Sequence, residues 1–224
     1  MPKSQTKTLT VVAAIACALI TSAHAAMTIS SAKTKNVSCT GGVCTPTGGN
    51  ANLNVSDLVT LLASSDVTVK SSAAAPDIGV LDPLTWASTH RLTLDSFQSI
   101  NVRAPVVVEG TTRLTLRTND GGSGGDYNFN TAASGAITFW DTASSLVING
   151  QLFKLVKDIK TLASDTANNP YGNYAFAASY DAKRMGTTTS HPSDISSAPW
   201  KAWGIPYRTC PSDCLTHQVF IFRA

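Results

Sequence analysis

The sequence predicts an all-β fold in which short strands stack as the coils of a solenoid. In short runs, apolar residues alternate with Thr, Asn, Asp or Arg, which is the period of a half-buried strand. The runs are similar to one another and turn residues separate them, as in repeat architectures. Aromatic residues make up only 7% of the chain, which suits a narrow interior lined by small side chains.

The predicted strands follow one another closely along the chain. They cover residues 67–69, 90–95, 100–103, 106–109, 113–117, 126–130, 136–140 and 146–149. Pairs such as Glu109-Gly110 and Asn149-Gly150 mark turns between them. No helical pattern precedes Gln151, which argues against alternating βαβ units. An antiparallel sandwich of two facing sheets is the alternative architecture.

A short amphipathic helix is predicted after the strands. Leu155, Ile159 and Leu162 recur at i, i+4 and i+7, and lysines occupy other positions around the helix. We therefore expect residues 51–150 to form the stacked coils and residues 151–182 to contain the helix.

The N-terminus has the pattern of a secretory signal peptide over residues 1–25. Lys3 and Lys7 precede an apolar stretch from residue 9 to residue 20, and Ala23-x-Ala25 ends it, so we expect cleavage between Ala25 and Ala26. The stretch is shorter than the roughly 20 residues of a spanning helix, which disfavours a membrane anchor. Lipidation at Cys17 is a weaker alternative because the apolar stretch continues past it.

Four cysteines remain after such cleavage, in two close pairs. In an exported chain the default interpretation of a close pair is a disulfide. Cys39 and Cys44 flank two glycines that allow a small loop to close, so we expect residues 26–50 to form a disulfide-closed N-terminal cap. Cys210 and Cys214 are a candidate second pair, and a zinc site drawn from all four cysteines is the alternative.

Composition excludes several classes of protein. Charged residues make up 14% of the chain, against about 25% in average globular proteins. Neutral polar residues must therefore supply the surface. The net charge of +3 is small and evenly spread, which argues against a nucleic-acid-binding protein.

A resemblance to a known family follows from the order of these segments. A tryptophan-bearing segment at 84–88 precedes Leu-x-Leu segments at 92–94 and 114–116 and an Ile-x-Val segment at 100–102. This order resembles the filamentous-haemagglutinin-like surface proteins, and residues 151–182 resemble the segment that precedes the GLUG motifs of large bacterial adhesins. Together the resemblance covers roughly residues 50–182.

The resemblance implies a right-handed parallel β-helix without catalytic activity or cofactors. It also implies export to the surface or outer membrane of a Gram-negative bacterium. The expected partners are host-cell, glycan or matrix surfaces and an outer-membrane translocator. The Asn-Pro-Asn-Gly motif of two-partner secretion is absent from the sequence, and Asn169-Pro170-Tyr171-Gly172 is the nearest match.

The resemblance breaks down in the C-terminal tail, residues 183–224. In the family a Glu-Gly-Leu-Gly motif follows, whereas this chain has Trp200-Lys-Ala-Trp203-Gly. In the neighbouring reading frame, the Trp-Lys codons must encode Glu and the Trp-Gly codons must encode Gly, as the motif requires. The resemblance therefore implies an irregular tail translated out of frame. A genuine tail closed by Cys210 and Cys214 is the alternative.

The sequence contains only weak matches to catalytic and metal-binding motifs. Residues 121–125 match the G-x-S-x-G nucleophile elbow, but a strand follows where a helix is needed. The same glycines begin one copy of a calcium-binding repeat, which occurs in tandem arrays elsewhere. The histidines are far apart and the aspartates occur singly: His90, His191, His217, Asp77, Asp82, Asp95, Asp120, Asp126 and Asp141.

We therefore predict no catalytic, cofactor-binding or metal-binding residues, and an exported N-terminal fragment of an adhesin-like β-helical surface protein that binds cells, glycans or matrix. The alternative function is a secreted β-helical polysaccharide lyase or hydrolase, which would need carboxylates gathered on one face. A small secreted sandwich with disulfides, unrelated to adhesins, is a third hypothesis.

Overall fold

The computed structural model describes residues 26–130, 134–179, 201–202 and 221–223. The predicted signal segment with Ala25, and Cys210, Cys214, His191 and His217 of the tail, lie outside the described residues. Among the described residues, no helix has both the length and the apolar character needed to cross a membrane.

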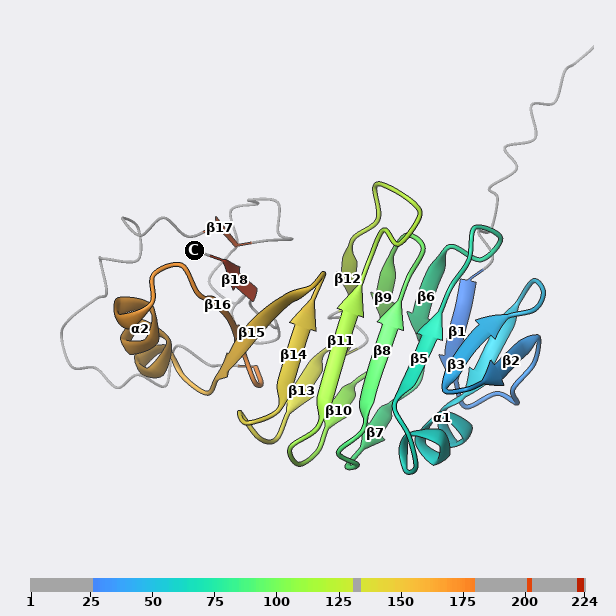
Figure 1. The fold of residues 1–224 in the computed structure, drawn as a ribbon, viewed down its shortest axis with the longest axis horizontal. Coiled ribbons are helices and arrows are strands. Elements are labelled where there is room, and N and C mark those ends of the chain that lie inside the picture. The colour runs from blue at the N-terminus through green and yellow to red at the C-terminus, as the bar shows by residue number, and fades with distance from the viewer. Residues whose placement is uncertain (1–25, 131–133, 180–200, 203–220, 224) are drawn as a thin grey trace, which may run out of the picture.

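Most of the described chain forms three sheets (Figure 1). The first, in the order β12-β9-β6-β1-β4, consists of β1 (Ala26–Ser30), β4 (Ala51–Asn54), β6 (Asp77–Val80), β9 (Ile100–Val102) and β12 (Tyr127–Phe129). The second, in the order β13-β10-β7, consists of β7 (Leu84–Trp86), β10 (Val106–Val108) and β13 (Ile137–Phe139). All pairs in these two sheets are parallel.

The third and largest sheet is mixed. It consists of β2 (Val37–Thr40), β3 (Val43–Pro46), β5 (Val67–Lys70), β8 (Arg91–Asp95), β11 (Arg113–Arg117), β14 (Ser145–Ile148), β15 (Gln151–Val156), β16 (Asn173–Phe176), β17 (Lys201–Ala202) and β18 (Ile221–Arg223). Its central strands β3, β5, β8, β11 and β14 are parallel. Antiparallel pairs lie on both sides of them: β2 with β3, β14 with β15, β16 with β18, and β17 with β18.

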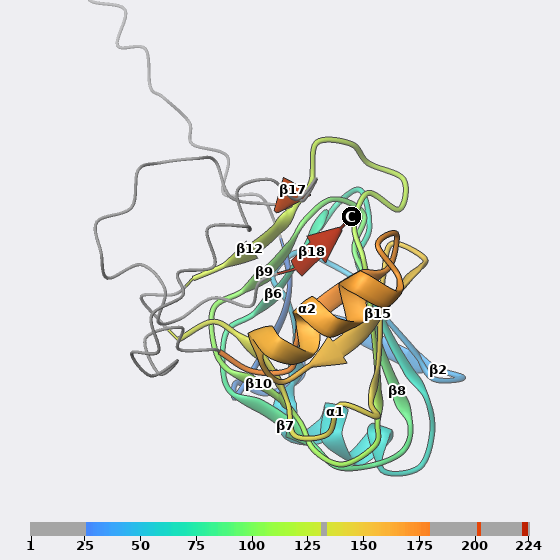
Figure 2. The same cartoon turned by 90° about the vertical axis from the view of Figure 1, so that its left-hand side faces the viewer.

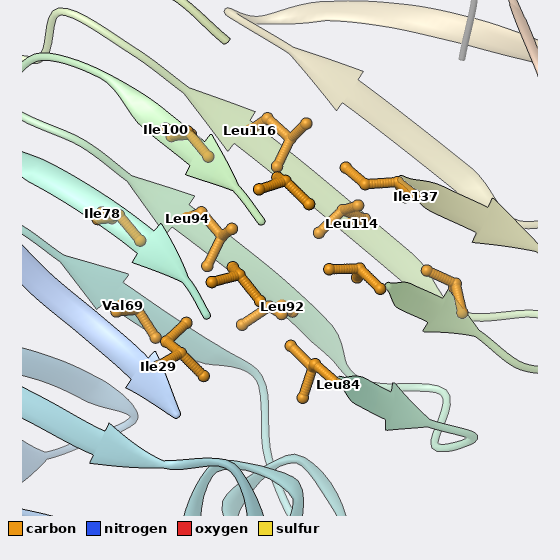
Figure 3. Close-up of a cluster of buried hydrophobic side chains, with 14 of the residues drawn as sticks. Ile29, Val69, Ile78, Leu84, Leu92, Leu94, Ile100, Leu114, Leu116 and Ile137 are labelled. Carbon is orange, nitrogen blue, oxygen red and sulfur yellow. The ribbon is translucent and has the colours of Figure 1, made fainter. Parts of the chain in front are cut away.

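The three sheets share one apolar core. In the central strands of the large sheet, every second side chain is buried, and register places these side chains in rows across the strands. One such row contains Val67, Leu92, Leu114 and Leu146. Figure 3 shows Leu92 and Leu114 in the same interior as Ile100 of the first sheet and Ile137 of the second. Burial of these rows is what holds the sheets together.

Two helices lie toward opposite ends of the sheets (Figures 1 and 2). Helix α1 (Val55–Leu62) begins where the side chain of Asn54 accepts the N–H groups of Ser56 and Asp57, at 2.8 and 3.4 Å. Its Leu58 and Leu62 are buried in the core shared by the sheets. Because α1 lies well before Gln151, the expectation that no helix precedes that residue is wrong.

Helix α2 (Ile159–Asn168) lies within the segment predicted to be helical, but it begins later than the pattern indicated. Asp158 caps it by accepting the N–H of Thr161 at 2.7 Å. Leu155, the first residue of the predicted helical pattern, lies instead in β15 and is buried in the main core. Leu162 packs in a small separate cluster with residues of β15 and β16.

The predicted all-β, right-handed parallel β-helix is wrong. In the part of the chain that the structure describes, no closed solenoid is found: the largest sheet is mixed, and two short helices accompany the three sheets. The physical reason lies in the turns. Asn149 and Gly150 both have positive φ, 47° and 79°, as in a two-residue hairpin turn, so β15 folds back antiparallel to β14. Gly41 and Gly42, at 57° and 78°, do the same between β2 and β3.

The β2–β3 hairpin carries a disulfide. Cys39 and Cys44 lie directly opposite each other, and a bond joins their sulfur atoms. The side chain of Cys44 is fully buried in the core, whereas Cys39 is exposed. The bond therefore ties the outermost strand, β2, to a residue anchored in the core.

Candidate binding surface

The outer face of β5, β8 and β11 carries the most regular arrangement of polar groups in the large sheet. Figure 1 shows these three strands side by side. Because successive side chains of a strand point to opposite faces, the residues that alternate with the buried ones point outward. We call the following eight residues the outer face: Thr68, Lys70, Arg91, Thr93, Asp95, Arg113, Thr115 and Arg117.

Register divides the outer face into three rows that run across the strands. Thr68, Thr93 and Thr115 form the central row. Lys70, Asp95 and Arg117 form the row at the carboxyl ends of the strands, and Arg91 and Arg113 form the row at the amino ends. Neighbours in a row are separated by the strand spacing of about 4.8 Å.

The central row presents free hydroxyl groups. Its three threonine residues are half-buried by their neighbours. Among the described residues, none of the three hydroxyl groups has a hydrogen-bond partner in the protein. A hydroxyl group both donates and accepts, so this row can bind a hydroxyl-rich ligand or water.

The carboxyl-end row is a compact cluster of opposite charges. The Lys70 ammonium lies 2.6 Å from Asp95 Oδ2 and also contacts Asp120, which follows β11. Arg117 Nη2 lies 3.1 Å from Asp120 Oδ1, and its Nε lies 3.9 Å from Asp95 Oδ1. The two cations and two carboxylates balance, and Asp95 is only 6% exposed. We infer that this cluster ties successive strands together and leaves little charge for a ligand.

These contacts change the acidity of two members of the cluster. Hydrogen bonds to Asp120 and Asp95 raise the pKa of Lys70 above its ordinary value of 10.5. The hydrogen bond from Lys70 holds the pKa of Asp120 below 3.8.

A second group of charges lies at the amino ends of the strands. Asp66 Oδ1 accepts the backbone N–H of Arg91 at 2.8 Å and lies 3.4 Å from Nδ1 of His90. The Arg113 guanidinium donates two long hydrogen bonds, of 3.3 and 3.4 Å, to the carbonyl of Thr89. The backbone hydrogen bond from Arg91, followed by the charge of Arg113, lowers the pKa of Asp66.

The outward row of the five-stranded sheet is chemically different. It contains Asn52, Thr28, Gly79, Asn101 and Asn128. Here polar side chains bond to one another: the Thr28 hydroxyl donates to Asn52 Oδ1 at 2.9 Å, and Asn128 Nδ2 donates to Asn101 Oδ1 at 3.0 Å. Part of the hydrogen-bonding capacity of this face is thus used internally, which favours the outer face of the large sheet as the binding surface.

Most of the aspartates singled out in the sequence accept backbone N–H groups. Backbone N–H groups donate to the carboxylates of Asp77, Asp82, Asp126 and Asp141. Only Asp95 and Asp120 come together, through their shared contact with Lys70. Within the described residues, no three His, Cys, Asp or Glu side chains form a group that could hold a metal ion.

The glycine-rich loop at 121–125 has a packing role in the structure. Gly121 and Gly122 lie against the ring of Phe97, where a Cβ atom would be 2.7 and 3.0 Å from ring atoms. The side chain of Asn119 closes the loop by accepting the N–H of Gly125 and donating to its carbonyl, at 2.7 and 3.0 Å.

Arg91 and Arg113 were not identified as site residues from the sequence. A signal was present: the tetrapeptide Arg-Leu-Thr-Leu occurs twice, at 91–94 and 113–116. In a parallel sheet, identical tetrapeptides in register place identical side chains next to each other.

Stability should be greatest between mildly acidic and moderately alkaline pH. Asp66, Asp82, Asp120 and Asp158 have folded-state pKa values below 3.8, so their contribution is present above that pH and is lost as the pH falls through the folded values. Lys70 has a raised pKa, so its contribution is present below pH 10.5 and is lost as the pH rises through the folded value.

Thermal unfolding followed by circular dichroism from pH 2 to pH 11 measures both limbs of this profile. Asp120→Asn should flatten the acid limb, whereas the wild-type chain should lose several degrees of Tm below pH 3.8. A Tm that stays constant from pH 7 to pH 2 would contradict the assignment of these carboxylates.

No family model, curated protein or solved structure matches the chain. The resemblance to the filamentous-haemagglutinin-like proteins therefore rests on the motifs at residues 84–116 and 151–182 alone. The outer face is the structural feature that bears on function.

Proposed function

We propose that the chain is an exported, adhesin-like surface protein that binds glycans or matrix on other cells and has no catalytic role. The observation that carries this proposal is the central row of the outer face. Thr68, Thr93 and Thr115 present three hydroxyl groups at regular spacing from adjacent strands. A regular array of this kind matches a polymer with repeating hydroxyl groups, because successive residues of the polymer can meet successive strands along the row.

The rigidity of the surface supports the same proposal. The backbone beneath the row belongs to central strands, and the inward neighbours Leu92 and Leu114 are at most 1% exposed. A preformed surface loses little conformational entropy when a ligand binds, so that weak hydrogen bonds can contribute to affinity. The neutral composition of the chain, with 14% charged residues, is also compatible with recognition through hydroxyl and amide groups.

Binding of residues 26–224 to a glycan panel and to whole cells tests the proposal. The double variant Thr93→Val/Thr115→Val keeps the β-branched shape but removes two hydroxyl groups. It should lower affinity about thirtyfold, since each of the two lost hydrogen bonds contributes about 1 kcal/mol. The matched control is Thr85→Val/Thr138→Val, which makes the same change on the outward row of the three-stranded sheet.

The control variant should bind as the wild-type chain does. An equal loss of affinity in both double variants would mean that the central row of the outer face is not the binding site. Absence of binding to every glycan, matrix component and cell tested would overturn the proposed function.

A further inference from the structure

We propose that the ligand of the outer face is an acidic polysaccharide, whose carboxylate groups bind Arg91 and Arg113. This inference rests on the proposed function and specifies its ligand class. In this inference the amino-end row recognises the charge of the ligand, and the central row recognises its sugar hydroxyl groups.

The geometry of the two arginines is the first argument. Arg91 on β8 and Arg113 on β11 are direct partners in the parallel register, on the outward side of adjacent strands. A guanidinium group presents a planar fork of donors that matches a carboxylate. Two such forks at the strand spacing of about 4.8 Å can bind two carboxylates of one polymer, or share one between them.

The charge balance at this position is the second argument. Like charges directly opposite each other in a sheet are destabilising, so packing alone gives no reason for paired arginines. Asp66 is the carboxylate placed beside them, and it already accepts the N–H of Arg91. At the other end of the same strands, Lys70 and Arg117 are matched by Asp95 and Asp120. The amino-end row thus keeps an excess of positive charge, whereas the carboxyl-end row does not.

The unused donors are the third argument. In the described part of the chain, the Arg91 guanidinium makes no hydrogen bond and no close ion pair, although its charge contributes to lowering the pKa of Asp66. Arg113 is 3.3 Å or more from its one acceptor, the carbonyl of Thr89, and its side chain lies on the exposed surface. Both groups therefore keep donors for an anionic ligand.

The neighbours of the pair favour a polysaccharide over a nucleic acid. The row continues across β14 with Ser145, and Thr93 and Thr115 lie beside the arginines on the same strands. Hydroxyl groups next to a cationic pair suit a polymer that alternates hydroxyl and carboxylate groups. Nucleic-acid binding draws its affinity from several phosphate contacts, and the net charge of +3 is too evenly spread to provide them.

Binding to polygalacturonate, to neutral dextran and to duplex DNA, measured at low and at physiological salt, tests the inference. The wild-type chain should bind polygalacturonate and lose affinity as salt rises. Arg91→Gln and Arg113→Gln should each weaken this binding about tenfold, the value expected for a hydrogen bond to a charged group. Arg103→Gln removes an exposed arginine just after β9 of another sheet, and is the matched control that should bind normally.

The outcomes separate this inference from the proposed function. Lack of binding to polygalacturonate, or equal binding by wild type and both glutamine variants, would overturn the inference. Retained binding to neutral glycans or cells in the same experiment would leave the proposed function standing. Tighter binding to DNA than to polygalacturonate would also overturn the inference of an acidic polysaccharide ligand. The Tm of each variant, measured alongside, shows whether a loss of binding reflects unfolding.

Discussion

Replacing Leu92 with alanine should destabilise the chain by about 2–5 kcal/mol, the range for truncating a buried leucine. Leu92 is fully buried and lies between Val67 and Leu114 in a row of the shared core. Figure 3 shows it among core side chains of all three sheets, so its truncation leaves a cavity in the interior that the sheets share. Urea denaturation of residues 26–224 measures the change in the free energy of unfolding.

Leu152→Ala provides the matched control. It makes the same truncation in a strand of the same sheet, but Leu152 is 64% exposed. Its effect should stay within about 0.5 kcal/mol, as for most surface substitutions. Similar losses in both variants would show that the core does not lie where the structure places it.

Replacing Gly125 with alanine should cost about 1–3 kcal/mol through overpacking. A Cβ atom at this position would lie 2.2 Å from the carbonyl oxygen of Gln98 and 2.3 Å from its carbonyl carbon. Both are backbone atoms, so no side-chain rotation relieves the clash and the loop must shift. The shift would also break the two hydrogen bonds by which Asn119 closes the loop. The Tm of the variant measures the loss.

Gly49→Ala is the control for this second prediction. No atom lies within 4 Å of the Cβ that it would add, and its φ is not positive. The substitution should be neutral or stabilise by up to about 1 kcal/mol, because alanine restricts the unfolded chain. A Gly125→Ala variant as stable as Gly49→Ala would mean that the loop does not pack against Gln98.

Local sequence patterns were enough to locate many of the strands. Alternation of apolar and polar residues indicated the segments that form β5 and the strands from β8 through β14, because a half-buried strand requires that period. The same alternation indicated which side chains are buried, such as Leu92, Leu94, Leu114 and Leu116. Local rules also placed Cys39 and Cys44 in one small loop, where the structure has a disulfide.

Helix α1 shows where sequence patterns were insufficient. Its eight residues are too few for a clear helical period, and several are β-branched, so local preference is weak. The cap at Asn54 and the burial of Leu58 and Leu62 against the sheets supply what the local sequence does not. Such stabilisation depends on residues that are distant in the chain.

The way in which the strands join into sheets depends on long-range packing and could not be predicted from local patterns. Alternation fixes which side of a strand is apolar, but it does not say whether the next turn carries the chain to another sheet or reverses it. At Asn149-Gly150 the chain reverses, which sets β15 antiparallel to β14 in the large sheet, an arrangement that the predicted solenoid does not have.

The candidate surface depends on the same long-range decision. Arg91 and Arg113 are 22 positions apart in the chain, and only the parallel register of β8 and β11 makes them neighbours. Alternation in the sequence places both arginines within predicted strands, on the polar side. Pairing of distant strands determined that they form a row beside the threonine hydroxyl groups, because register is set by the packing of the shared core rather than by local sequence.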